Sequence, residues 1–132
     1  ETNESVKNDY KLSLAELYQQ DKRPDLAEFH LITVLEYLRK TLGGGHINTL
    51  MCMNTLASVY AEQKKLLSAE TLFIDCVEGF SSTVGNDHEV TLSVMVALSH
   101  IYVSQEKYER AEPLLKKCIE SKTKTVGADD PE

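Results

Sequence analysis

The sequence lacks any long hydrophobic run and any excess of positive charge. Its longest uninterrupted apolar stretch is residues 94–98, far short of the roughly 20 residues that a membrane-spanning helix needs. Asp and Glu number 21 against 14 Lys and Arg, which gives a net charge of −7. Because nucleic acids and anionic membranes attract proteins through clustered positive charge, this balance predicts that the chain binds neither.

Cysteine is scarce, tryptophan is absent, and no targeting segment is visible. The three cysteines show no CxxC spacing, which favours reduced thiols and a cytoplasmic location over a disulfide-bonded secreted protein. The acidic N-terminus has no apolar segment of the kind found in signal peptides. Hydrophobic residues still make up 42% of the chain, too many for a disordered acidic segment and enough for a folded core.

The sequence repeats itself every 42 residues, and this period determines the expected architecture. Residues 43–84 and 85–126 align without a gap and share 16 identical positions. Residues 1–42 match more weakly, and Lys11 and His30 stand at positions that are apolar in the other two repeats. Either this first repeat caps the array or a divergent repeat precedes it, and His30 itself is interpreted as an edge or capping substitution. A fixed period between about 20 and 50 residues is typical of solenoids, whose units bury their apolar faces against neighbouring units.

Within each repeat the apolar residues follow a helical period. Ala69, Leu72, Phe73, Cys76 and Val77 are spaced i, i+3, i+4, i+7 and i+8, which predicts an amphipathic helix. No segment alternates with a period of two, so no strand is expected. Six helices are predicted, as antiparallel pairs, at about residues 5–20, 24–42, 47–63, 66–83, 89–105 and 108–125.

Glycines mark the ends of the repeats. Gly43, Gly85 and Gly127 occupy equivalent positions and are expected to end helices with a positive φ. Residues 1–132 are therefore predicted to form a single array with repeats at about 1–42, 43–84 and 85–126. Residues 127–132 are expected to begin a fourth repeat, so that the chain is part of a longer array and its last helix keeps an uncovered apolar face.

The order of large and small residues resembles the tetratricopeptide repeat (TPR). The pattern Leu56-Ala57-x-x-Tyr60, followed by Ala69 and Phe73, matches the TPR succession of large and small positions. The long period, the motif G-x-x-H-x-x-T-L at 43–50 and 85–92, and A-E-x-L at 69–72 and 111–114 are similar to kinesin light chains and related arrays. This resemblance implies an all-α, right-handed superhelical solenoid of three antiparallel helix hairpins, with a non-catalytic function.

Residue types that often carry chemistry are assigned structural roles by their positions. His46 and His88 lie one whole repeat apart with no third ligand near, so a role at a helix N-terminus is predicted instead of a metal site. Cys76 and Cys118 share one small core position, and Cys52 is also expected in or near the core. No phosphate loop, G-x-S-x-G or H-E-x-x-H motif occurs. The sequence therefore predicts no catalytic residue, no cofactor and no metal.

The resemblance implies that the first helix of each pair lines a concave groove that binds a peptide. The twelve groove positions it assigns contain no Lys or Arg, so the two-residue basic clamp of chaperone-binding TPRs is missing. The groove grades from acidic in the first repeat to apolar in the others, which predicts a peptide with apolar anchors and a basic end. The positions are Asp9, Leu12, Glu16, Gln19, Met51, Asn54, Ser58, Ala61, Ser93, Val96, His100 and Val103.

The favoured function is a protein–protein interaction module, a kinesin-light-chain-like adaptor or scaffold that binds a protein or peptide. One alternative is a regulatory sensor array belonging to a larger signalling NTPase, which the flanking sequence would identify. Another is a self-association module in which the exposed face of the last repeat stacks on a second copy. That face is expected to comprise Leu114, Leu115, Cys118 and Ile119.

Overall fold

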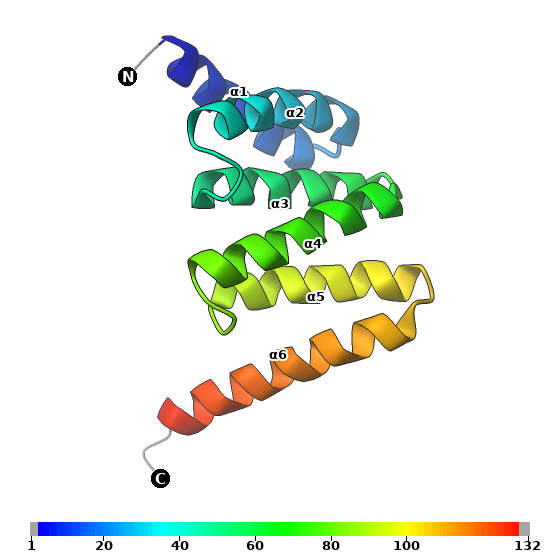
Figure 1. Cartoon of the computed structure of the whole chain (residues 1–132). Coiled ribbons are helices and arrows are strands. Elements are labelled where there is room, and N and C mark those ends of the chain that lie inside the picture. The colour runs from blue at the N-terminus through cyan, green and yellow to red at the C-terminus, as the bar shows by residue number, and fades with distance from the viewer. Residues whose placement is uncertain (1–2, 130–132) are drawn as a thin grey trace.

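Six helices form the whole of the computed structural model, which describes the backbone of residues 3–129 and the side chains of residues 3–124 (Figure 1). Each helix packs mainly on its neighbours along the chain, and the three hairpins stack one upon another (Figure 1). This arrangement confirms the predicted all-α solenoid. The helices are α1 (Asn3–Gln20), α2 (Pro24–Thr41), α3 (Ile47–Glu62), α4 (Leu66–Thr83), α5 (Glu89–Ser104) and α6 (Tyr108–Asp129).

The helix boundaries agree with the sequence-based ones to within two residues, except at the end of α6. That helix was expected to stop near residue 125, with Gly127 in the turn that follows, but it continues to Asp129. At Gly43 and Gly85 a following helix folds back on its predecessor, and both residues have positive φ, 89° and 104°. Glycine permits a positive φ but does not require one, so the i→i−4 hydrogen bonding of α6 continues through Gly127 to Asp129.

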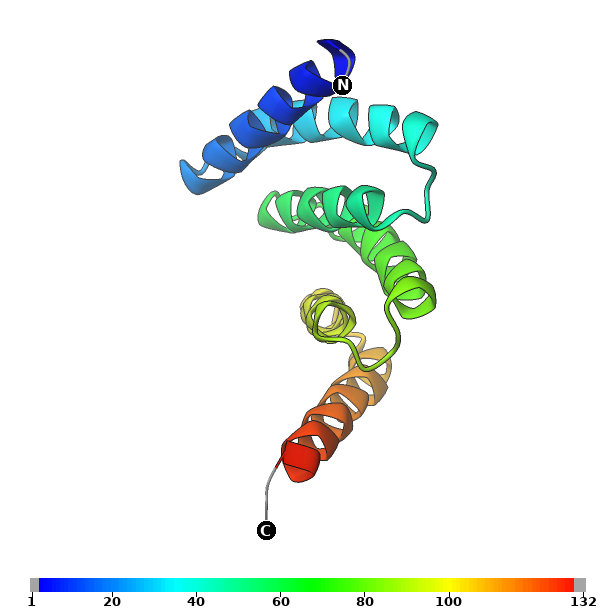
Figure 2. The same cartoon turned by 90° about the vertical axis from the view of Figure 1, so that its left-hand side faces the viewer.

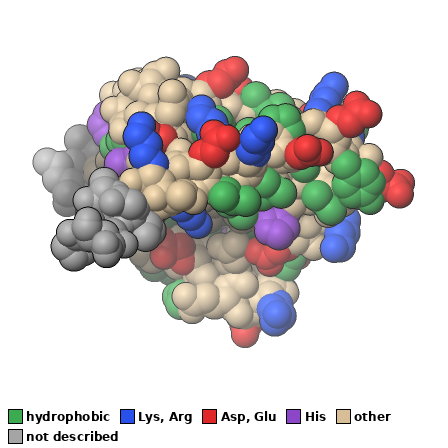
Figure 3. Space-filling model, turned by 90° about the horizontal axis from the view of Figure 1, so that it is seen from below, with side chains coloured by type: hydrophobic (Ala, Val, Ile, Leu, Met, Phe, Trp, Pro, Cys, Tyr) green, Lys and Arg blue, Asp and Glu red, His purple; other side chains and the backbone are tan. Residues whose placement is uncertain are grey.

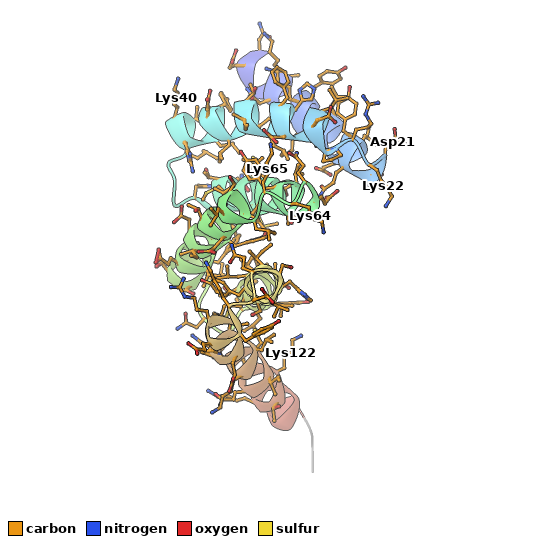
Figure 4. All side chains as sticks on the ribbon, turned by 90° about the vertical axis from the view of Figure 1, so that its right-hand side faces the viewer. Asp21, Lys22, Lys40, Lys64, Lys65 and Lys122 are labelled. Carbon is orange, nitrogen blue, oxygen red and sulfur yellow. The ribbon has the colours of Figure 1, made fainter. Side chains whose placement is uncertain are left out.

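The turn inside each hairpin uses a residue other than glycine in the left-handed region. Lys22, Lys64 and Glu106 have φ values of 59°, 66° and 61° and are one repeat apart. In each turn, the backbone N–H of the following residue donates to a carbonyl five positions earlier, as Lys65 does to Tyr60 at 2.9 Å. Figure 4 shows Lys22 and Lys64 at the same edge of the molecule, because each hairpin repeats the same turn.

Small side chains allow the helices to approach one another. Ala15, Ala27, Ala57 and Ala69 are all fully buried at the positions that the sequence marks as small. Large apolar side chains fill the remaining space, and Phe73 is only 2% exposed. The main core runs continuously through all three hairpins, from α1 to α6. Since adjacent hairpins share that core, each repeat depends on its neighbours for burial.

Candidate functional site

The first helices of the three hairpins form one layer of the solenoid. Figure 2 shows α1, α3 and α5 following one another on the left-hand side of the stack, with α2 and α4 on the right. All twelve predicted groove residues belong to α1, α3 or α5, and none of them is buried. The layer therefore presents these side chains to solvent instead of packing them in the core.

A hollow of about 450 Å³ lies between α1, α2 and α3. It brings together four of the predicted groove residues, Asp9, Leu12, Glu16 and Met51. Asp9 and Glu16 are exposed carboxylates on α1, while Met51 is 45% exposed on α3. The hollow thus combines acidic side chains with an apolar wall, a combination that suits a cationic group carried on an apolar segment.

The remaining predicted residues do not share this hollow. Gln19 is engaged elsewhere, because its Nε2 donates to Oε1 of Glu62 on α3 at 2.8 Å. Val103 lines a separate depression over α6. The others form a more open surface along α3 and α5: Asn54, Ser58, Ala61, Ser93, Val96 and His100.

The hollow is also lined by α2 and its C-cap residue, which the sequence-based assignment left out. Tyr37, Thr41 and Leu42 line it together with Asn48 and Thr55 of α3. Tyr37 and Thr41 are four residues apart, so they lie on one face of α2. That spacing is a usable signal, but the resemblance to other repeats assigns the groove to first helices alone.

His46 and His88 cap α3 and α5, which confirms the predicted role at helix N-termini. In each case the imidazole Nδ1 accepts a hydrogen bond from a backbone N–H two residues on, that of Asn48 at 3.0 Å and that of Val90 at 3.1 Å. Both caps have extended backbone, as capping residues normally do. The motif G-x-x-H-x-x-T-L therefore encodes a turn followed by a helix cap.

The three cysteines are buried free thiols, as the sequence suggested. Burial raises the pKa of Cys52 to about 11 and that of Cys76 to about 12, and it raises the pKa of Cys118 as well. The Cys76 thiol donates to the carbonyl of Leu50, and the Cys118 thiol donates to the equivalent carbonyl of Leu92, both at 3.6 Å. A protonated, enclosed thiol is a poor nucleophile and a poor metal ligand, so these groups act in packing.

His30 lies at the edge of the core, as its interpretation as an edge substitution requires. Its ring stacks on Tyr18 of α1 at a centroid distance of 5.7 Å and meets Phe29 edge to face at 5.3 Å. Elsewhere in the part of the chain described, no group of three metal-ligating side chains converges. The described helices also include none that is long and apolar enough to cross a membrane.

The outer face of α6 forms a second depression, of about 690 Å³, near the end of the stack. Val103, Tyr108, Leu115 and Ile119 line it with apolar surface, and Glu112, Lys116 and Glu120 also line it. Figure 3 looks onto the molecule from below and shows hydrophobic side chains exposed among acidic and basic ones. Of the four residues expected on this face, Leu115 and Ile119 are exposed, whereas Cys118 is buried and Leu114 packs against the core.

Comparison with known sequences and structures gives one family match. The tetratricopeptide repeat model matches residues 9–82 and again 54–124. No curated protein matches the chain.

Solved structures resemble the fold closely at low sequence identity. BtubC (BKLC) from P. vanneervenii superposes with a TM-score of 0.86 at 19% identity, over 94% of this chain and 49% of its own. Two structures of a Podosopora anserina protein described as a kinesin light chain with nearly identical TPR-like repeats also superpose. One of them, a single-substitution variant, has a TM-score of 0.83 at 23% identity, over 99% of this chain and 62% of its own. The other structure superposes with a TM-score of 0.80 at 24% identity, over 92% of this chain and 58% of its own. The present chain thus spans about half to three fifths of these relatives.

Proposed function

Because the chain belongs to the tetratricopeptide repeat family, we propose that it is a non-catalytic module that binds a peptide or segment of a partner protein. The groove would run along α1, α3 and α5, with the hollow between α1, α2 and α3 as its most enclosed part. A cytoplasmic adaptor or scaffold of the kinesin-light-chain type is the context that we infer from the repeat type.

The observation that carries this proposal is the meeting of Asp9, Leu12, Glu16 and Met51 around one hollow. Four of the twelve positions assigned from sequence line this concave site, and all twelve remain accessible to solvent. Concave sites with apolar walls and a few polar groups are the usual form of binding sites. This supports a groove assigned to the first helices.

The charges of the groove favour a ligand that is basic at one end and apolar at the other. Asp9 and Glu16 place two carboxylates on α1, whereas α5 offers Val96 and Val103. No Lys or Arg occupies any of the twelve positions. A peptide carrying acidic groups would meet like charge in the first repeat, which costs binding energy and slows association.

A peptide-array screen at two salt concentrations tests this proposal. The purified chain should retain peptides that combine basic and aliphatic residues. Higher salt should weaken their binding, because salt screens the attraction between exposed charges. Glu16→Lys should abolish the preference for basic residues, and Val96→Asp should weaken the aliphatic contacts. Glu78→Lys on the solvent face of α4 changes the net charge equally and serves as the matched control.

The proposal fails if binding persists unchanged in both Glu16→Lys and Val96→Asp. It also fails if the best ligands are acidic peptides. Equal loss of binding in Glu78→Lys would show that net charge, and not the groove, determines retention.

A second candidate function is self-association through the last repeat. It is favoured by the exposure of Leu115 (38%) and Ile119 (64%) on α6. Apolar side chains grouped on one face of this kind commonly mark interaction surfaces. Light scattering on the purified chain should show a mass that rises with concentration, and a constant monomer mass would exclude this candidate.

A further inference from the structure

We propose that the hollow between α1, α2 and α3 binds one arginine side chain of the partner peptide, and that Asn8 makes this site prefer arginine to lysine. The inference rests on the peptide-binding function proposed above and adds the residue type that this part of the groove accepts. Asn8 lines the hollow, although it is not one of the twelve groove positions assigned from the sequence.

Asn8 is a polar residue at a position that is apolar in the other two repeats. Its equivalents Leu50 and Leu92 are 2% and 6% exposed, and Asn8 itself is 4% exposed. In the second repeat the Leu50 side chain fills the space beside Gly79, where an added Cβ would lie 2.5 Å from Leu50 Cδ2. Tyr37 stands at the Gly79 position in the first repeat, and it lines the hollow together with Asn8. The fold accepts leucine at this position, so packing alone does not require the amide.

The amide oxygen of Asn8 is a buried acceptor without a donor. The side-chain Nδ2 donates to the backbone carbonyl of Glu4 at 2.7 Å. Because a carbonyl can only accept, the nitrogen must face Glu4 and the oxygen must face away from it. No donor in the described part of the chain reaches Oδ1. A buried acceptor of this kind lowers stability, and a ligand N–H group that enters the hollow would relieve that cost.

Further acceptors surround the hollow. Thr41 and Thr55 use their hydroxyl protons on their own helices, donating to the carbonyl of Tyr37 at 2.9 Å and to that of Met51 at 3.1 Å. Their oxygens therefore remain available as acceptors. Asp9 adds a carboxylate that forms no ion pair with any side chain that the structure describes. No described Lys or Arg lines the hollow, so the site has negative charge and acceptors without a cation of its own.

The spacing along α1 places the ligand's cationic head group beside Asn8. Asn8, Leu12 and Glu16 follow one another at intervals of four residues, so they form one stripe of the helix. A rise of about 1.5 Å per residue separates Asn8 from Glu16 by about 12 Å, too far for one head group to contact both. The head group therefore meets Asn8 and the adjacent Asp9, and its apolar stem crosses Leu12. Glu16 adds attraction at longer range.

Arginine satisfies these acceptors better than lysine does. Its planar guanidinium carries several N–H donors in a fixed arrangement, so it can donate to Oδ1 of Asn8 and to the Asp9 carboxylate at the same time. A lysine ammonium is a compact and strongly hydrated charge, and it loses more hydration when it enters an enclosed site. We expect arginine to bind roughly three- to tenfold more tightly than lysine, the ratio that one additional hydrogen bond typically gives.

The hollow does not belong to the outer face of α1. Where α2 packs on α3, the Cys52 thiol donates to the carbonyl of Leu31 at 3.8 Å. Tyr10 is the equivalent of Cys52 in α1, so a hairpin packed before α1 would cover Tyr10. Tyr10 does not line the hollow, and an adjoining repeat would therefore leave the hollow open.

Capped amino acids test this site without a complete peptide ligand. The isotope-labelled chain is titrated with N-acetyl-arginine amide, N-acetyl-lysine amide and the uncharged N-acetyl-citrulline amide, and binding is followed by NMR. The arginine compound should shift the side-chain amide of Asn8 and the backbone amides of Leu12 and Met51. The lysine compound should bind roughly three- to tenfold more weakly, and citrulline should also bind more weakly because it has no charge to meet Asp9. Equal binding of all three compounds would overturn the inference.

Two variants at Asn8 test the acceptor itself. Asn8→Leu introduces the residue of the other two repeats, and Asn8→Ala removes the amide without filling the hollow. Both variants should keep the amide spectrum of the remaining helices, and both should lose most of the preference for arginine over lysine. If both variants keep the full preference, Asn8 does not determine it and the inference is overturned.

Asp9→Asn tests the contribution of charge. It removes one negative charge with little change in size, so it should weaken the arginine and lysine compounds alike, roughly two- to fivefold, since exposed ion pairs contribute modestly. Glu78→Gln removes an equal charge from the solvent face of α4, outside the hollow, and should bind both compounds as the wild-type chain does. Equal weakening in Glu78→Gln would show that net charge alone attracts the compounds, which would overturn the site.

The titration and the peptide array together separate this inference from the proposed function. If the array retains basic–aliphatic peptides that bind equally well after their arginine is replaced by lysine, the peptide-binding function stands and the arginine site is overturned. If the arginine compound shifts the residues of the hollow but the array retains no peptide, the arginine site stands and the peptide-binding function fails. An arginine compound that shifts no residue of the hollow overturns the inference directly.

Discussion

Replacing Gly79 by alanine has two opposing effects on the stability of the fold, and their magnitudes can be compared. Gly79 lies inside α4, where alanine is favoured over glycine by roughly 1 kcal/mol because it restricts the unfolded backbone. A methyl group at this position would lie 2.5 Å from Leu50 Cδ2, 2.9 Å from Cδ1 and 3.3 Å from Cγ. All three atoms at the end of the Leu50 side chain face the new group.

Packing should outweigh helix propensity at this site. Leu50 is 2% exposed, so its side chain has little space into which it can rotate away from the new methyl group. Forcing an extra carbon into a filled core typically costs about 1–3 kcal/mol. We therefore expect Gly79→Ala to lower the free energy of unfolding by roughly 1 kcal/mol, measured by urea denaturation at constant m-value.

A double-mutant cycle identifies the cause. Leu50→Ala alone should cost about 2–5 kcal/mol through the lost burial and the cavity. In that background the methyl group of Gly79→Ala has space, so the second change should stabilise the protein by up to about 1 kcal/mol. If Gly79→Ala stabilises the wild-type chain, or if its effect is the same in both backgrounds, the packing argument is refuted.

Two further changes test the caps and the buried thiols. His46→Ala should lower the free energy of unfolding, measured by urea denaturation, by about 1 kcal/mol because α3 loses its N-cap. His46→Asn should retain most of the stability, since asparagine also caps helices. Equal losses in the two variants would contradict the capping role. Cys52→Val places at this position the residue type of Val94, its equivalent in the third repeat. Burial raises the Cys52 pKa from 9.0 to about 11, so between pH 9 and 11 the unfolded chain releases a proton that the folded chain keeps. Stability due to this thiol is therefore complete below pH 9 and falls by up to about 1.4 kcal/mol per pH unit above it. Unfolding measured at pH 8 and pH 10 should show a smaller alkaline loss in Cys52→Val, and an equal loss would contradict the burial argument.

The sequence predicted the helices well because one physical requirement recurs three times. Helices with buried stripes must pack on their neighbours, so residues such as Ala69 and Ala111 or Cys76 and Cys118 recur at equal spacing. The histidine caps were predictable for the same reason, since His46 and His88 stand at equivalent helix starts. A period supported by many positions is robust to the variation of any one of them.

The local sequence did not predict two features of the turns. Lys22, Lys64 and Glu106 adopt positive φ, although residues of these types carry no particular signal for it. Gly127 shows the converse, because it carries the turn signal and yet lies within α6. Glycine permits a positive φ without imposing it, so the glycine alone does not determine where α6 ends.

The groove residues are less predictable than the core because repeat packing does not constrain them. At one equivalent position the three repeats have Asp9, Met51 and Ser93, all three of them exposed. No neighbouring helix requires a particular size or polarity there, so the three repeats can differ without loss of stability. The same freedom allows such positions to differ in the ligand that they favour, which is why the fold follows from the period whereas the ligand has to be inferred from the individual side chains.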